Sequence, residues 1–484
     1  MQYVTPNIDK PVFRLSIFVL LVSIAGFCAT TNFWILVTPF ALAYILLLGV
    51  NWKAAYWVFL LCIPLSVQIG LMNDTLSLSL PDEPMCWLFL LLFIFLAAAN
   101  PDRISNWWMQ NPITIIIVLQ FLWLLVAVLF SGVFLLSLKF LVAKTWYLVC
   151  FFIFPMWVFD NKKDFKTAFH LFFWPVLATM VVIVFRHALL GFKFTTIGIA
   201  LRWLYVNHVE YGAVISTFFP FVWIAYKLSK NKKKWIRRSL WLCLLFFLVA
   251  IYLSYARSAI LAIVFAAIVG LAIHKRWAHI VMPVFYSCII SLLACLVYND
   301  NYLQLTPEFD HTAMHSNYIT HIEATIKGKD MSAMERVYRW VAAVRMSADR
   351  PLTGYGPHGF VHYYKPYTLN VFKTYVSKNE EGSTTHNYFL YMLTEQGWPA
   401  MLLYALLIMV VFVQAQRIYH RFTDGFYKYC TLGLAMAFAA FFINNFFSEF
   451  VETHKVGAMF YIILALLVIL NKKSKEEANG NIAK

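Results

Sequence analysis

The stretch Ser383-Thr384-Thr385-His386-Asn387 places a histidine between the longest polar segment of the chain and a long apolar run. Histidine has the side-chain pKa nearest neutrality, so it can accept a proton at physiological pH. At such a boundary it can meet a water-borne acceptor and a lipid-borne donor. Thr384 or Thr385 can cap the helix that follows, and the positive end of that helix would lower the pKa of His386. We therefore predict that His386 is a general base.

Arginines in two other segments could bind an anion near this histidine. Arg257 lies in a tight turn between two apolar runs, where a charge is costly unless it is paired or faces water. Arg336 is expected in the first turn of a helix, where anions are favoured. Because a planar guanidinium can donate two parallel hydrogen bonds to phosphate, we predict a phosphate-binding site at Arg257 and Arg336. Arg339 is the reserve for Arg336, and Arg202 would add positive charge. The alternative for Arg257 and Arg202 is an arginine that anchors a helix end at the membrane interface. For Arg336 and Arg339 it is a solvated arginine on the protein surface.

The polar segment 299–385 contains one clear helix signal. Ser332-Ala-Met-Glu335 fits a capping box, in which the serine and the glutamate satisfy free backbone N–H groups. The predicted helix runs from about Ala333 to Ala348 and ends before Pro351. A loop this long inside a compact protein is usually functional.

Composition decides the class of protein that holds these residues. The 484 residues are 62% hydrophobic and 13% charged, with a mean hydropathy of +0.70. Long apolar runs indicate a polytopic membrane protein, and continuous rather than alternating runs favour helices over a barrel. The eight cysteines include no CxxC pair, so the sequence suggests neither a disulfide framework nor a zinc site. We expect an all-α polytopic membrane protein with about 12–14 transmembrane helices and a large, partly helical periplasmic loop.

The expected number of transmembrane helices comes from fourteen apolar runs in the sequence. If two of these runs are re-entrant or interfacial, twelve would cross the membrane. They cover residues 12–28, 33–50, 54–72, 85–99, 113–131, 138–158, 168–186, 209–227, 239–254, 258–274, 279–298, 386–415, 429–447 and 456–470.

The net charge of +16 belongs largely to short loops between these runs, so it does not indicate nucleic-acid binding. With fourteen spans the basic loops fall on the side of the N-terminus, which is therefore expected to be cytoplasmic, and both termini lie there. The segment 299–385 would then face the periplasm. We divide the chain into N-terminal transmembrane helices (1–238), a core with the periplasmic loop (239–415), and C-terminal transmembrane helices with a cytoplasmic tail (416–484).

Four short patterns resemble the O-antigen ligase-related family of bacterial inner-membrane glycosyltransferases. They are Arg257-x-x-x-Leu261, Arg336-x-x-x-Trp340, the segment from Pro351 to Gly356, and His386 followed after ten residues by Gly397. Trp340 departs from the family, which has leucine there. Gly397 is expected on the same helix face as His386, where a glycine serves helix packing. Glu395 would point to the opposite face and is given no role.

The resemblance implies a metal-independent and cofactor-free glycosyltransferase. Its donor would be a glycan on undecaprenyl diphosphate, with the pyrophosphate held by Arg257 and Arg336. His386 would deprotonate the acceptor, which for an O-antigen ligase is lipid A–core. An O-antigen polymerase or a protein O-oligosaccharyltransferase uses the same donor and stays open. A polysaccharide or lipid transporter is the alternative from another class and would show internal repeats and ionisable groups near the midplane. Membrane lipids are expected partners, and nucleic acid is not. If His386 is not the base, His358 and His362 come next.

Overall fold

The computed structural model describes residues 10–30, 33–71, 76–99, 107–306, 330–373 and 384–482. Within them helices dominate, and a single antiparallel hairpin supplies the strands. This confirms an all-α polytopic membrane protein. The chain forms two compact units, Met1–Cys62 and Ile63–Lys484. The domain division made from the sequence stays a prediction.

The first unit contains three apolar helices: α1 (Lys10–Thr30), α2 (Phe33–Val50) and α3 (Trp52–Cys62). Inside this unit, the hydroxyl of Tyr44 on α2 donates to the carbonyl oxygen of Ala55 on α3, 3.2 Å away.

Helices long and apolar enough to cross a membrane number eleven in the described residues, and all belong to the second unit. Shorter apolar helices occupy parts of residues 21–65. The eleven are α4 (Asp82–Ala99), α5 (Pro112–Leu129), α6 (Phe134–Leu148) continued through a π-helical turn (Val149–Ile153) into α7 (Phe154–Val158), α8 (Lys162–Leu189), α10 (His208–Leu228), α11 (Lys234–Leu253), α12 (Arg257–His274), α13 (Ala278–Val297) continued by the 3₁₀ segment Tyr298–Leu305, α17 (Tyr388–Arg421), α18 (Gly425–Phe446) and α19 (His454–Ile482).

One of the fourteen apolar runs, 54–72, is wrong as a membrane-spanning helix. Its helical part ends with the 3₁₀ turn Ile63–Leu65, and Val67–Leu71 forms strand β1. This strand pairs with β2 (Leu76–Leu80), with Val67 opposite Leu80. Pro64 explains the ending, because proline lacks an N–H donor and disfavours helical geometry in the residue before it. About 20 apolar residues are needed to cross a bilayer.

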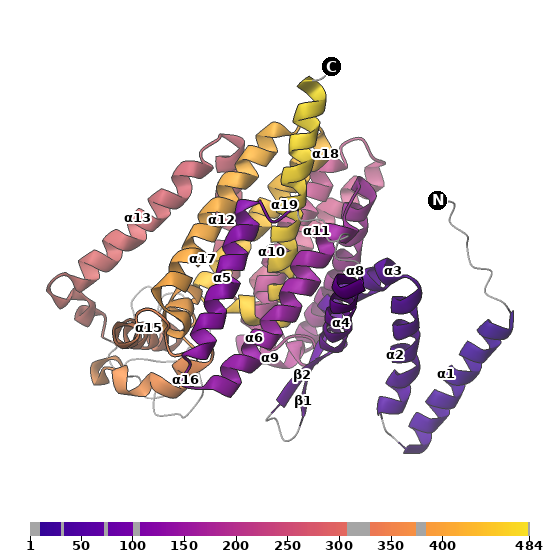
Figure 1. The fold of residues 1–484 in the computed structure, drawn as a ribbon, viewed down its shortest axis with the longest axis horizontal. Helices are drawn as coiled ribbons and strands as arrows, with labels where there is room; N and C mark the ends of the chain where they lie inside the picture. The colour runs from indigo at the N-terminus through magenta and orange to yellow at the C-terminus, as the bar shows by residue number, and fades with distance from the viewer. Residues whose placement is uncertain are drawn as a thin grey trace. The chain divides into compact units, whose positions relative to one another are not determined.

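A layer of short elements covers one end of the long helices (Figure 1). It contains the β1–β2 hairpin, the turn Phe194–Thr196 with α9 (Ile197–Leu201), α15 (Met331–Asp349), α16 (Gly359–Tyr363), and the 3₁₀ turns Lys365–Tyr367, Asn370–Phe372 and Phe450–Glu452. The described parts of the segment 299–385 are therefore partly helical, as predicted. Residues 307–329 and 374–383, with Ser383, lie outside the described residues.

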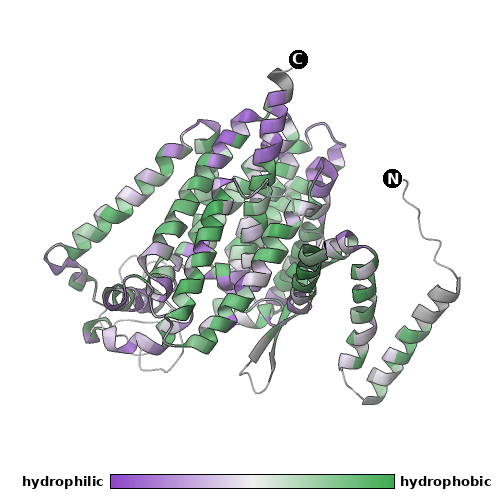
Figure 2. Cartoon of the chain, viewed as in Figure 1, coloured by the Kyte–Doolittle hydropathy of each residue, from purple (hydrophilic) through white to green (hydrophobic). Residues whose placement is uncertain are grey.

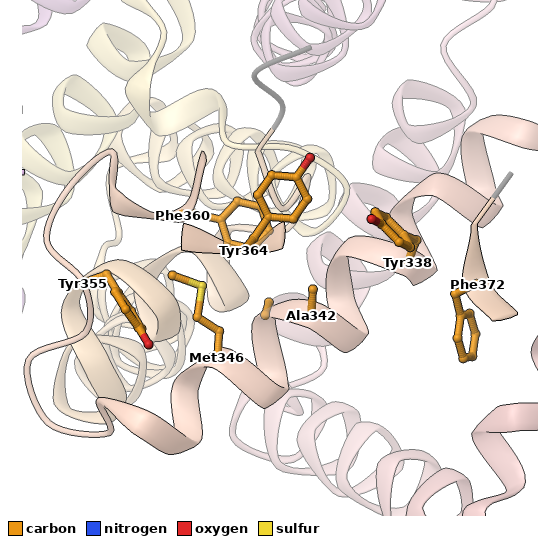
Figure 3. Packing of buried hydrophobic residues seen from close by; sticks show 8 residues of the cluster. Tyr338, Ala342, Met346, Tyr355, Phe360, Tyr364 and Phe372 are labelled. Carbon is orange, nitrogen blue, oxygen red and sulfur yellow. The ribbon is translucent and has the colours of Figure 1, made fainter. Parts of the chain in front are cut away.

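The part of this layer around α15 has its own apolar core, shown in Figure 3. It consists of Tyr338, Ala342, Ala343, Met346, Tyr355, Phe360, Tyr364 and Phe372. Figure 2 shows apolar residues along the long helices and polar residues at their ends and on α15. Since α10, α12, α17 and α19 all start at the layer, the basic loops that follow their other ends lie opposite it.

Candidate functional site

His386 sits in a left-handed backbone conformation, with φ +50°, two residues before α17 begins. A side chain other than glycine adopts this region at an energetic cost, so the flanking residues must hold it. Asn387 caps α17, since its Oδ1 accepts the N–H groups of Phe389 (3.0 Å) and Leu390 (3.1 Å). The prediction that Thr384 or Thr385 caps this helix is wrong, because both hydroxyls are bonded elsewhere.

Those hydroxyls donate to Glu449, in the short connection between α18 and α19. Thr384 Oγ1 lies 2.7 Å from Glu449 Oε2, and Thr385 Oγ1 lies 2.7 Å from Oε1. The Asn387 N–H also donates to Oε1, at 3.2 Å. Burial raises the pKa of Glu449, and these hydrogen bonds oppose that rise. His386 Nδ1 is 3.9 Å from Glu449 Oε2, too far for a hydrogen bond. Glu449 thus holds the residues on either side of His386 rather than the imidazole itself.

The surroundings of His386 keep its imidazole neutral. Burial lowers its pKa to about 4, and the positive charges of Arg336 and Arg339 act in the same direction. The sequence suggested the positive end of the following helix as the cause of a lowered pKa. Burial is instead the largest cause, and the two arginines come from α15.

Arg257 is the first residue of α12 and links that helix to α15. Its Nη2 lies 3.2 Å from Oδ2 of Asp330, whose side chain is fully buried. The same Asp330 oxygen accepts the Ala333 N–H at 3.0 Å, which makes Asp330 the cap of α15. Close packing places Arg257, because a Cβ at Gly212 of α10 would lie 2.5 Å from the Ala256 Cβ.

The capping box predicted at Ser332 is wrong, because Asp330 takes that place and α15 starts at Met331. Arg336 consequently lies in the second turn, not the first. Burial lowers the pKa of Arg336, followed by the nearby charge of Arg257, while Asp330 and Glu449 favour its charged form.

Arg336 and Arg339 both present a guanidinium with unused bonding capacity. The Nε atoms of both are buried with no hydrogen-bond partner among the described residues. Arg339 Nη2 is 3.6 Å from Glu335 Oε2 on the same helix. A buried donor without a partner is costly, and an anion bound between these side chains would satisfy it.

Trp340, the departure from the family pattern, joins α15 to the histidine segment. Its Nε1 donates to the Thr385 carbonyl oxygen at 2.9 Å. The structure therefore brings Arg257, Arg336 and Arg339 together with His386 at one end of the helices.

Arg202 lies elsewhere. It is exposed, directly after α9, and its guanidinium carbon lies 5.6 Å from the centroid of the Trp203 ring. It lines a separate pocket of about 310 Å³, whose lining includes neither His386 nor the other three arginines.

Gly397 interrupts α17 instead of continuing its face. It has φ +79°, and a Cβ there would lie 1.9 Å from the Leu352 carbonyl oxygen. The Trp398 N–H donates to the Pro351 carbonyl oxygen, 2.9 Å away. The expected helix-packing glycine is therefore wrong, because Gly397 breaks the helix and packs against the chain that follows α15.

The carbonyl groups before this break have partners outside the helix. Tyr355 and Gly356 donate their N–H groups to the carbonyl oxygens of Thr394 and Glu395, each at 2.9 Å. The Trp123 indole donates to the Gln396 carbonyl oxygen at 2.8 Å. The side chain of Glu395, given no role from the sequence, is buried and accepts the His358 N–H at 2.9 Å.

Sequence reasoning also missed Glu449. The available signal was a carboxylate in a very short connection between two apolar runs, where an ionisable group needs a partner. Among the described residues, no three His, Cys, Asp or Glu side chains are grouped as ligands of a metal ion. The arrangement instead suits an anion held by guanidinium groups beside a neutral imidazole that can take a proton.

The comparison with protein families gives one match. Residues 242–405 match the family model described as O-antigen ligase. The matched range contains Arg257, Arg336, Arg339 and His386, whereas Arg202 and Glu449 lie outside it. No curated protein matches the chain.

Proposed function

We propose, from the chain's membership of the O-antigen ligase-related family, that it transfers a glycan from undecaprenyl diphosphate to lipid A–core. Members of this family are lipid-linked glycan transferases. The observation that carries the proposal is the gathering of Arg257, Arg336 and Arg339 beside a partly exposed histidine whose pKa is lowered.

In this mechanism the donor pyrophosphate binds between Arg257 and Arg336, with Arg339 beside them. The neutral imidazole of His386 takes the proton of the acceptor hydroxyl. The acceptor oxygen then forms a bond to the anomeric carbon. The bond from that carbon to the pyrophosphate oxygen breaks, and the electron pair leaves with undecaprenyl diphosphate. Guanidinium groups already in place stabilise the charge that develops on this leaving group.

Donor binding also changes the pKa of His386. The positive charges of Arg336 and Arg339 help to lower the pKa of His386 in the free protein. A bound diphosphate places negative charge next to both arginines, so it raises the pKa of the imidazole toward neutrality. The histidine becomes a stronger base when the substrate is present.

The orientation follows from the basic loops. Lysine and arginine residues gather at the helix ends opposite the layer that holds His386. Such residues are enriched on the cytoplasmic side of membrane proteins. We therefore place the basic loops and the C-terminal end of α19 in the cytoplasm and His386 at the periplasmic face of the inner membrane. A site at one end of the helices favours a transferase over a transporter, whose site would lie near the midplane.

The test uses the purified full chain in nanodiscs, given lipid-linked glycan and lipid A–core. Transfer is followed on a gel, with His386→Ala as the variant. Transfer by the wild type and its near loss in the variant, with donor binding retained, support the mechanism. Wild-type turnover by His386→Ala would overturn the base assignment and direct attention to His358 and His362.

A gene deletion identifies the acceptor. Free glycan polymer left on its lipid carrier indicates a ligase, and a loss of chain length indicates a polymerase. Unchanged lipopolysaccharide indicates a protein acceptor and contradicts lipid A–core.

A further inference from the structure

We propose that the pocket beside α9 binds one saccharide ring of the glycan substrates, stacked on Trp203. This inference rests on the proposed function. The pocket is separate from the His386 site and has a volume of about 310 Å³, at the small end of the range for ligand pockets. Its lining includes Gln68, Arg202, Trp203, Tyr205, Glu210 and Lys455.

Trp203 is the residue that suggests a ligand. Its side chain is 66% exposed, and its backbone has φ +74°. A bulky residue in this conformation is an outlier that the surrounding structure must hold in place. The turn after α9 does so, because the N–H groups of Leu204 and Tyr205 both donate to the Leu201 carbonyl oxygen. An indole presented in this way offers a flat face to the apolar C–H surface of a sugar ring.

Two buried charged side chains support the backbone that directly follows Trp203 in the sequence. Lys455 donates to the carbonyl oxygen of Leu204, and its Nζ lies 4.1 Å from the centroid of the Tyr205 ring. Glu210 accepts the Val206 N–H at 2.9 Å. These contacts fix the chain from 204 to 206 and form a polar wall beside the indole.

The polar groups in the pocket match hydroxyl chemistry. A sugar hydroxyl both donates and accepts hydrogen bonds, and the lining supplies donors in Arg202 and Lys455 and an acceptor in Glu210. The Glu210 carboxylate offsets one of these two cations, so the pocket offers an acceptor beside its donors rather than positive charge alone. This assigns Arg202 to a sugar rather than to the pyrophosphate.

Two chain segments join residues of the pocket to residues of the reaction centre. The chain between α18 and α19 carries Glu449, which holds the His386 segment, and continues into Lys455 at the pocket. On the other side, Gly212 lies two residues after Glu210 and packs against Ala256, next to Arg257. A glycan attached at the centre can therefore extend into the pocket.

Oligosaccharide binding to the full chain in nanodiscs tests the proposal. One probe is the free oligosaccharide of the donor, and the other is deacylated lipid A–core oligosaccharide. The wild type should bind at least one probe. Trp203→Ala should weaken that binding roughly tenfold, from lost aromatic stacking, and Trp203→Phe should retain most of it.

The matched control is Trp235→Ala. Trp235 is also 66% exposed but lies near the start of α11, at the opposite helix ends. It should bind the probes as the wild type does. The affected probe shows whether the sugar comes from the donor or the acceptor, and either result supports the pocket.

Three results would overturn the proposal that this pocket binds a saccharide. They are no probe binding by the wild type, undiminished probe binding by Trp203→Ala, or a loss of probe binding in Trp235→Ala equal to that in Trp203→Ala. The second would make Trp203 an anchor at the lipid interface. The His386→Ala variant separates this proposal from the function. It should bind the probes normally while transfer fails. If His386→Ala transfers glycan at the wild-type rate, His386 is not the base. The binding results for the Trp203 variants would still show whether the pocket binds a saccharide.

Discussion

Trp340 and Thr385 are joined by a hydrogen bond of 2.9 Å from the indole N–H to the carbonyl oxygen, one residue before His386. This bond ties the helix that carries Arg336 and Arg339 to the segment that carries the histidine. The distance between the proposed phosphate ligands and the proposed base therefore depends on it.

Trp340→Phe keeps an aromatic ring and removes the donor. The expected loss of stability is about 1 kcal/mol, the usual net contribution of a hydrogen bond. The expected loss of turnover is larger than that of donor affinity, because the base is displaced while the arginines stay on their helix. Steady-state kinetics and thermal melting of the same preparations measure both. Unchanged kcat would contradict this account.

Arg336→Ala should weaken donor binding by an amount on the order of 2–4 kcal/mol, as for the truncation of other buried charged contacts. Arg336→Lys should recover only part of it, because an ammonium cannot form the two-pronged contact. Donor titration against each variant measures the change. Arg345→Ala is the control, since Arg345 is exposed on the same helix and donates to the Tyr367 carbonyl oxygen. Equal affinity in Arg336→Ala and the wild type would contradict the assignment.

The pH profile should show two different acid limits. The acid limb of kcat/KM reports the free protein and that of kcat reports the substrate complex. Because the pKa of His386 is lowered to about 4 in the free protein, activity should be lost only as pH falls well below 6.5. Donor binding shields Arg336 and Arg339, so the limb of kcat should lie at higher pH.

Arg339→Gln provides the check on this reading. It removes one of the charges that lower the pKa of His386, so the limb of kcat/KM should move to higher pH. A limb that stays in place in Arg339→Gln would show that another group limits the profile.

Glu449→Gln should lower turnover with little change in donor affinity. The amide can accept hydrogen bonds at only one of the two oxygen positions, so one of Thr384 and Thr385 loses its acceptor and His386 loses part of its support. Rescue separates positioning from simple instability. Glu449→Asp, which keeps both acceptors on a shorter side chain, should recover more turnover than Glu449→Gln at the same melting temperature. The reverse order would count against a positioning role.

Gly397→Ala should destabilise the protein by roughly 2–4 kcal/mol, because an added Cβ meets the Leu352 carbonyl oxygen and the backbone needs a positive φ. Thermal melting in detergent measures this. Gly425→Ala is the matched control, since no atom lies within 4 Å of a Cβ built there. Similar melting temperatures for the two variants would argue against a strained contact at Gly397.

Local patterns in the sequence were enough to predict the long helices and α15. A proline at 351 and an apolar period act within a few residues, so they can be read without the fold. The helix caps predicted at Ser332 and at Thr384 were wrong. In each case a neighbouring residue, Asp330 or Asn387, was equally suited to cap the helix, and tertiary contacts decided between them. At 54–72, hydrophobicity alone did not distinguish a helix from a short helix followed by a strand.

The partners in the candidate site were beyond such patterns. Glu449 acts on residues more than sixty positions earlier in the chain, and Arg257 meets Asp330 across seventy-three. Sequence patterns could not set Arg202 apart, because it is a basic residue in a loop at the correct helix end. In the structure it lines a different pocket. Only the packing of α10 against α12, and of α15 against the His386 segment, selects among equally plausible arginines.

The interruption at Gly397 divides α17 into two parts whose backbone groups have different hydrogen-bond partners. The carbonyl groups of residues 394–396 are bonded to Tyr355, Gly356 and Trp123 rather than to the next helical turn. Residues 388–396 should therefore open and close as one cooperative unit with α15, and their amide hydrogens should exchange at a common rate. The amides of 401–421 belong to the bilayer-embedded part and should exchange far more slowly. His386 would then share the fluctuations of Arg336 and Arg339 on α15, not those of the membrane helix to which it is covalently joined.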